Sequence, residues 1–164
     1  MTRCATTAVL ALVTLAAVAK AGGPPTTAPT DPGTTLQLIF DLLKNGEVGL
    51  ATSYVIASKD RDAAKALTRT AERIKIHGSL EFLEQKVDGD IAFVVMKAPR
   101  GKGNWEFEAG PMARRDGQWK VVMDRDGLQE LFPDKKKQAQ KLEEWGDKRR
   151  SELREAASSA TTAP

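Results

Sequence analysis

The chain has 164 residues, of which 41% are hydrophobic, with 25 basic and 22 acidic side chains. This composition is typical of a globular protein with about one domain. The net charge of +3 falls to +1 if residues 1–21 are removed, because Arg3 and Lys20 leave with them. A nearly neutral mature chain argues against nucleic-acid binding, which depends on a strong positive field.

Residues 1–21 have the pattern of a cleavable export signal. Arg3 provides a positive start, residues 5–19 form an uncharged apolar run, and Ala19-Lys20-Ala21 supplies small residues for cleavage before Gly22. The apolar run is shorter than the roughly 20 residues of a membrane-spanning helix. We therefore expect an exported protein, periplasmic or extracellular, with no membrane span after signal cleavage.

The only cysteine, Cys4, lies within this signal, so the mature chain has none. Disulfides, thiolate metal sites and a lipid anchor on cysteine are therefore excluded for the mature chain. There is also no histidine-rich cluster, since His77 is the only histidine. The sequence predicts neither a metal site nor a cofactor site.

Composition divides the rest of the chain into four segments. Residues 22–33 are rich in proline, threonine and glycine and predict a flexible leader. Residues 34–132 are long enough for one domain with a single core. Residues 133–157 predict a charged C-terminal helix, and residues 158–164 a disordered tail.

The domain begins with a helical pattern. The first helix is predicted to stop at Asn45-Gly46. Its apolar residues have helical spacing and are Leu36, Ile39, Phe40 and Leu43. A second helix is predicted from Glu47 to about Ala57. A third helix is predicted to begin at Asp60, which would be its N-cap.

After Gly78 the pattern predicts four strands, at about residues 79–87, 90–98, 104–113 and 118–124. Asp88-Gly89 and Asp116-Gly117 suit tight hairpin turns. The second strand is apolar on both faces and should be central, whereas in the third Glu106 and Glu108 indicate one wet face. The predicted fold class is α+β, with N-terminal helices packed on a bent four-stranded antiparallel meander.

Two segments of this sheet resemble the cone-shaped α+β fold of the nuclear transport factor 2-like superfamily, in its small secreted branch near lumazine-binding-like proteins. They are Gly89, Asp90, Ala92 and Val94 in the second strand, and Asp116, Gly117, Trp119, Lys120 and Val121 in the last hairpin. The likeness covers about residues 34–124 and implies a concave sheet wrapped on a helix. It does not imply a function, since proteins with this fold include isomerases, dehydratases and pure binding modules.

Enzymes that resemble this scaffold use acid and base groups inside the cone. The candidates for such a pocket here are Tyr54 and Asp41, although each also fits a structural role: Tyr54 continues an apolar helix side, and Asp41 fits a solvent-facing position. His77 stands at a helix end without an identifiable partner. No catalytic residue can be assigned.

The charged helix has a thin apolar stripe formed by Leu142, Trp145 and Leu153 and interrupted by Gly146. It could pack on the domain, which we favour, pair with a partner chain such as a second copy in a homodimer, or rest on an anionic surface through its lysines. Trp145 and Leu142 are the candidate contact residues, because a large aromatic on a charged helix usually marks a contact.

These observations lead to one leading hypothesis and two alternatives. The leading hypothesis is an exported non-enzymatic module that binds a small apolar ligand or another protein. The first alternative is a cofactor-independent isomerase or dehydratase with its acid and base residues inside the cone, which requires a buried carboxylate or Tyr54 in an open pocket. The second is a structural envelope protein that assembles through residues 133–157.

Overall fold

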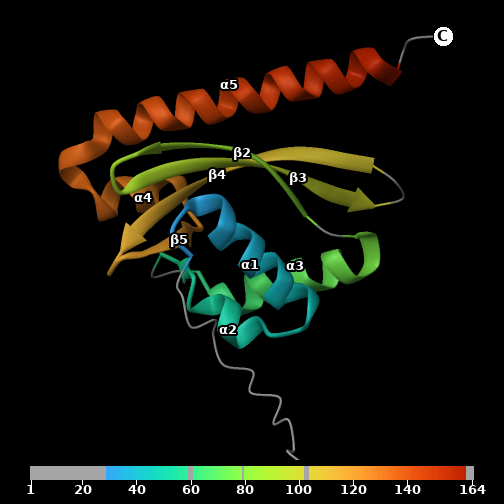
Figure 1. Ribbon diagram of the computed structural model, residues 1–164, viewed down its shortest axis with the longest axis horizontal. Helices are drawn as coiled ribbons and strands as arrows, with labels where there is room; N and C mark the ends of the chain where they lie inside the picture. The colour runs from blue at the N-terminus through green and yellow to red at the C-terminus, as the bar shows by residue number, and fades with distance from the viewer. Residues whose placement is uncertain (1–28, 59–60, 79, 102–103, 162–164) are drawn as a thin grey trace, which may run out of the picture.

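The computed structural model describes residues 29–58, 61–78, 80–101 and 104–161. It has a bent β-sheet between two layers of helix (Figure 1). On one side lie α1 (Pro32–Lys44), α2 (Val48–Thr52) and α3 (Ala63–His77), and on the other α4 (Arg125–Leu131), a short 3-10 turn (Pro133–Lys135) and α5 (Lys136–Thr161). The predicted α+β class is confirmed. The predicted signal peptide lies outside the described residues.

The first helices differ from the prediction at their ends. Asp31 caps α1 by accepting a hydrogen bond from the Thr34 amide, so the helix already begins within the segment predicted to be a flexible leader. Asp62, and not Asp60, caps α3 through the Lys65 amide. Helix α2 ends at Thr52, well before the predicted end at Ala57.

The sheet has five strands, one more than predicted, in the order β1-β5-β4-β3-β2. They are β1 (Val55–Ile56), β2 (Glu81–Asp88), β3 (Ile91–Gly101), β4 (Asn104–Arg115) and β5 (Gln118–Val122). The extra strand, β1, runs parallel to β5, whereas the other pairs are antiparallel. A strand of two residues has no periodicity to read, and its pairing depends on β5, more than 60 residues later in the chain.

Two tight turns join the outer pairs of antiparallel strands. Asp116 and Gly117 both have positive φ, as a type I′ turn requires, and they link β4 to β5 as predicted. The β2–β3 turn is one residue later than predicted: Asp88 pairs with Ile91, so the loop is Gly89-Asp90. Only Gly89 of these two has positive φ, which fits a type II′ turn.

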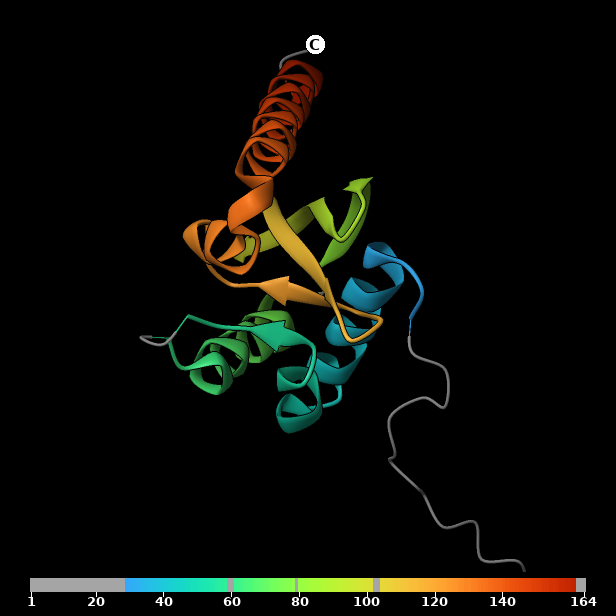
Figure 2. The same ribbon diagram turned by 90° about the vertical axis from the view of Figure 1, so that its left-hand side faces the viewer.

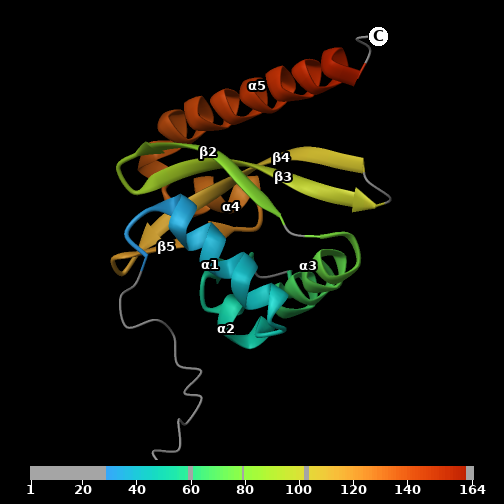
Figure 3. The same ribbon diagram turned by 45° about the vertical axis from the view of Figure 1, so that its right-hand side comes forward.

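Each face of the sheet is covered by its own apolar cluster. Toward α1 and α3, buried residues such as Leu36, Ile74 and Val94 form the larger cluster. Toward α4 and α5, the cluster contains Phe93 from the sheet and Leu142 from α5. Strand β3 contributes to both, in agreement with its predicted central place, and Figure 2 and Figure 3 show the helices on the two sides of the sheet.

Helix α5 packs on the sheet of its own chain, as favoured from the sequence. Gly146 permits the close approach, since a Cβ at this position would lie 2.8 Å from Cδ1 of Phe93. The Arg149 guanidinium donates hydrogen bonds of 2.6–2.9 Å to the Glu84 carboxylate on β2, which lowers the pKa of Glu84. The helix extends to Thr161, so residues 158–161 are not the predicted disordered tail.

No helix among residues 29–58, 61–78, 80–101 and 104–161 combines the length and the apolar character needed to cross a bilayer.

Candidate ligand-binding cavity

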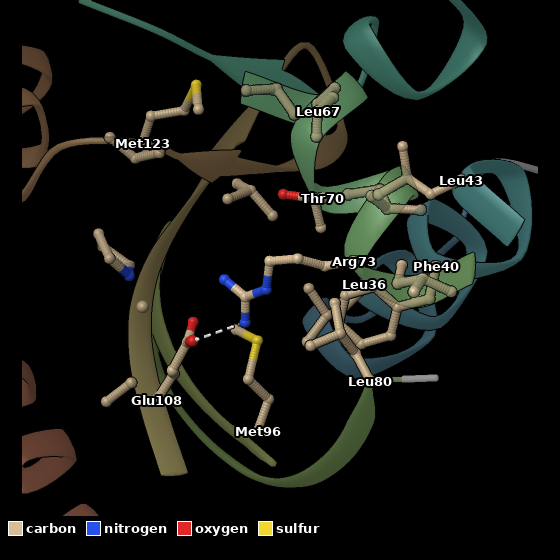
Figure 4. A pocket seen from close by; sticks show the side chains of 18 of the residues that line it. Leu36, Phe40, Leu43, Leu67, Thr70, Arg73, Leu80, Met96, Glu108 and Met123 are labelled. Carbon is tan, nitrogen blue, oxygen red and sulfur yellow. Dashed lines mark hydrogen bonds and ion pairs between the residues drawn. The ribbon is translucent and has the colours of Figure 1, made fainter. Parts of the chain in front are cut away.

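A cavity of about 340 Å³ lies between helices α1 and α3 and the concave face of the sheet (Figure 4). Its walls are mostly apolar, and representative residues are Leu36, Phe40, Leu43, Leu67, Leu80 and Met96. The volume is at the lower end of the range for small-molecule pockets, which are typically apolar concavities with few polar groups.

The spacing of residues in the two helices explains the apolar wall. In α1, the lining residues recur at intervals of three and four, so they share one face of the helix: Leu36, Ile39, Phe40 and Leu43. In α3, Leu67, Thr70 and Ile74 follow the same spacing. Arg73 stands at the border of this second face, from which its long side chain reaches across the cavity (Figure 4).

Among the residues that the structure describes, two charged side chains line the cavity, Arg73 from α3 and Glu108 from β4. Nη2 of Arg73 lies 3.5 Å from Oε1 of Glu108 and also donates to the Pro99 carbonyl at 3.3 Å. Both distances are longer than the usual 2.9–3.0 Å for such bonds. The two side chains are 47% and 40% exposed, so this end of the cavity reaches the surface.

The strands place Glu108 beside an apolar neighbour. In the β3–β4 register, Met96 lies opposite Glu108, and both side chains line the cavity. Thr70 is the remaining polar side chain among the described residues of the wall, and its hydroxyl donates to the Ala66 carbonyl of its own helix at 3.1 Å. The arrangement is therefore a mostly apolar chamber with one ion pair at its open end.

The residues predicted from the sequence to form a pocket do not line this cavity. Asp41 is exposed on α1, where Gln37 donates a hydrogen bond of 3.3 Å to it. Tyr54 is only 5% exposed and belongs to the apolar cluster on the helical side of the sheet. His77 is exposed at the end of α3, beside Gly101. The structure thus does not bring a Tyr54–Asp41 pair into the cavity.

The two predicted contact residues of the C-terminal helix pack within the chain. Leu142 is 2% exposed in the cluster between α5 and the sheet, and Trp145 packs against the same cluster. The Lys86 ammonium lies 5.9 Å from the centre of the Trp145 ring. Both side chains therefore contact the convex face of their own sheet.

Sequence reasoning missed Arg73 and Glu108. The alternation in the third predicted strand placed Glu108 on a wet face, but Glu108 lines the cavity there and meets Arg73 of α3. The opposite face of the strand is covered as well, since Ala109 packs against the apolar cluster between the sheet and α5. A weak signal was present: Arg73 directly precedes Ile74, one of the apolar residues of its helix, and therefore borders the buried face.

In the described part of the chain, no three His, Cys, Asp or Glu side chains gather as metal ligands would. That the protein binds no metal and no cofactor remains a prediction from the sequence.

No family model and no curated protein matches the sequence. Several solved structures show partial likeness, and three of them follow. A Campylobacter jejuni protein with the provisional name NTF2-like transpeptidase is 15% identical, with 57% of this chain and 99% of that chain covered and a TM-score of 0.44. A SEC-C motif containing protein of Rhodopseudomonas palustris is 12% identical, with 59% and 79% covered and a TM-score of 0.45.

The third is a de novo designed protein with a curved β-sheet, 16% identical, with 68% and 93% covered and a TM-score of 0.38. Likeness at these scores assigns neither family nor activity. The first of the three has NTF2-like in its name, and the likeness of this chain to the nuclear transport factor 2-like superfamily and its lumazine-binding branch stays a prediction.

Proposed function

We propose that the protein is an exported, non-enzymatic binding module that holds a small apolar ligand in the cavity between α1, α3 and the sheet. The cavity itself is the observation that carries this proposal: about 340 Å³, walled by leucine, isoleucine and phenylalanine, and open at the Arg73–Glu108 end. An apolar chamber gains affinity by taking apolar ligand surface out of water, at about 25 cal/mol per Å².

The proposal of export depends on the sequence of residues 1–21. If this segment is a cleaved signal, expression of the full chain in an exporting bacterial host yields a secreted or periplasmic product that begins at Gly22. Mass spectrometry of the intact product measures this directly. A cytoplasmic product that keeps residues 1–21 would contradict export and leave the proposal on the cavity unaffected.

The enzymatic alternative lacks the residues that it requires in the cavity. It required Tyr54 or a buried carboxylate in the cavity, but Tyr54 is packed in the apolar cluster and Asp41 is exposed. Glu108 is the carboxylate among the described lining residues, and it is ion-paired and 40% exposed. The assembly alternative has no specific support either, because Leu142 and Trp145 contact their own sheet.

The cavity can be filled with one substitution that has a close control. Thr70 and Thr68 lie on the same helix, and each hydroxyl donates to the carbonyl four residues earlier. Thr70 lines the cavity, whereas Thr68 is exposed. Thr70→Phe therefore places a ring in the chamber, and Thr68→Phe places the same ring in solvent.

Isothermal titration calorimetry with naphthalene and 1-decanol tests the proposal. We expect wild type and Thr68→Phe to bind at least one of the two compounds with equal affinity. Thr70→Phe should weaken this binding by at least tenfold. Equal binding by Thr70→Phe and Thr68→Phe, or no binding by the wild type, would contradict the proposed site.

A further inference from the structure

The ion pair at the open end of the cavity determines which ligand head groups can bind there. Arg73 and Glu108 are the charged side chains among the described lining residues, so the wall has one positive and one negative group. Figure 4 shows the guanidinium extending across the chamber toward the carboxylate. Any head group that enters beside this pair meets both charges.

The ion pair between Arg73 and Glu108 is weak. Its closest contact is 3.5 Å, and both groups are partly exposed, conditions under which an ion pair contributes little to stability. Within the described residues, Arg73 uses only Nη2 for hydrogen bonds, to Glu108 and to the Pro99 carbonyl. A guanidinium has five N–H donors, so most of those on Arg73 remain open to a ligand.

Charge decides between three kinds of head group. A carboxylate would accept hydrogen bonds from Arg73 but would lie beside the like charge of Glu108. An ammonium would donate to Glu108 but would lie beside Arg73. A hydroxyl accepts from Arg73 and donates to Glu108 at the same time, so both charged groups gain a hydrogen bond and neither meets a like charge.

The volume limits the size of the apolar body. At about 30 Å³ for each water-sized group, a cavity of 340 Å³ holds roughly 11 non-hydrogen atoms. A straight ten-carbon chain with one hydroxyl has this size.

We propose, building on the binding function proposed above, that the cavity selects uncharged amphipathic ligands: an apolar body of about ten carbon atoms and one head group that both accepts and donates a hydrogen bond, as a primary alcohol does. Arg73 and Glu108 act together as the specificity-determining residues. They bind the head group as a charge-balanced pair, and the apolar wall binds the body.

Calorimetry at pH 7.5 with 1-decanol, sodium decanoate and decylammonium chloride tests this selectivity, each below its solubility or micelle limit. Each of the three compounds has ten carbon atoms, and they differ in the charge of the head group. We expect 1-decanol to bind wild type about tenfold more tightly than either charged compound, the difference that one hydrogen bond to a charged group makes.

Removing one charge at a time should change the order in opposite directions. Glu108→Gln leaves Arg73 unbalanced, so decanoate should become the tightest ligand of the three. Arg73→Gln leaves Glu108 unbalanced, so decylammonium should become the tightest. Glu106→Gln and Arg69→Gln, which change charges of the same strand and helix outside the cavity wall, should keep the wild-type order.

The outcomes separate the two proposals. If wild type binds the three compounds equally, or if both cavity variants keep the wild-type order, the head-group selectivity is wrong while the binding function stands. If wild type binds none of the three compounds, nor naphthalene, the binding function itself is wrong. Thermal melts of all four variants identify any loss of affinity that comes from unfolding.

Discussion

The approach of α5 to the sheet depends on a residue without a side chain. A Cβ added at Gly146 would lie 2.8 Å from Cδ1 of Phe93 and 3.4 Å from Cβ of Ala109. Phe93 is 1% exposed and packed in the cluster between the sheet and α5, so its ring cannot move aside without disturbing buried neighbours. Overpacking a core costs about 1–3 kcal/mol, whereas Gly→Ala in a helix gains about 1 kcal/mol. We expect Gly146→Ala to lower the free energy of unfolding by about 1 kcal/mol.

A second helical glycine provides the control. Gly49 in α2 is exposed, and no atom lies within 4 Å of an added Cβ, so Gly49→Ala should raise the free energy of unfolding by up to about 1 kcal/mol. Urea unfolding followed by tryptophan fluorescence should shift the midpoints in opposite directions, by roughly 0.5 M each at an m-value of about 2 kcal/mol/M. If Gly146→Ala raised the midpoint as Gly49→Ala does, the close packing of α5 on Phe93 would be refuted.

Three further predictions concern the caps and contacts of the helices. Asp31→Ala should cost about 1 kcal/mol through loss of the α1 cap, whereas Asp31→Asn should cost less, as urea unfolding at pH 7 would measure; equal losses would show that capping is not the cause. Because the hydrogen bonds from Arg149 lower the pKa of Glu84 below its ordinary value of 4.5, the stability they give is present above that value and is lost as the pH falls through the lowered pKa. Glu84→Gln should thus be less stable than wild type at pH 7, and the difference should shrink as the pH falls below 4.5; a difference of the same size at every pH down to the acid limit of folding would contradict the ion pair. Trp145→Ala should lower the free energy of unfolding by about 2 kcal/mol, less than for a fully buried tryptophan, without changing the molecular mass measured by light scattering; a change of mass would favour the assembly alternative.

The sequence predicted the elements whose signals are local. The four longer strands, the first and third helices and the Asp116-Gly117 turn follow from periodicity and turn chemistry, and the structure has them within a few residues. Strand β1 was missed because two residues in a helical context have no strand pattern, and their pairing comes from β5. The turn between β2 and β3 was placed one residue too early, because Asp-Gly is the commoner turn sequence. The pairing register of the two strands determines that the loop is Gly89-Asp90 and not Asp88-Gly89.

The candidate site was harder to predict, because it depends on which elements cover each face of the sheet. Alternation correctly separated Glu108 from Ala109, but it assigned the glutamate face to solvent, while α3 brings Arg73 against it. The predicted candidates, Tyr54 and Asp41, were chosen by chemistry alone, and the fold places one in the core and the other on the surface. The cavity volume depends on packing between two helices and the sheet, and no local sequence pattern records it.

The measurement that tests the central claim most directly is a methyl NMR titration of the mature chain with 1-decanol. The two apolar clusters lie on opposite faces of the sheet, so their methyl signals report separately on each side. We predict saturable shifts for cavity residues Leu36, Leu43 and Leu67, with Leu128 and Leu142 on the α5 side unchanged. Shifts confined to the α5 side, or no shift up to the solubility limit of 1-decanol, would contradict the proposal that this cavity is the binding site.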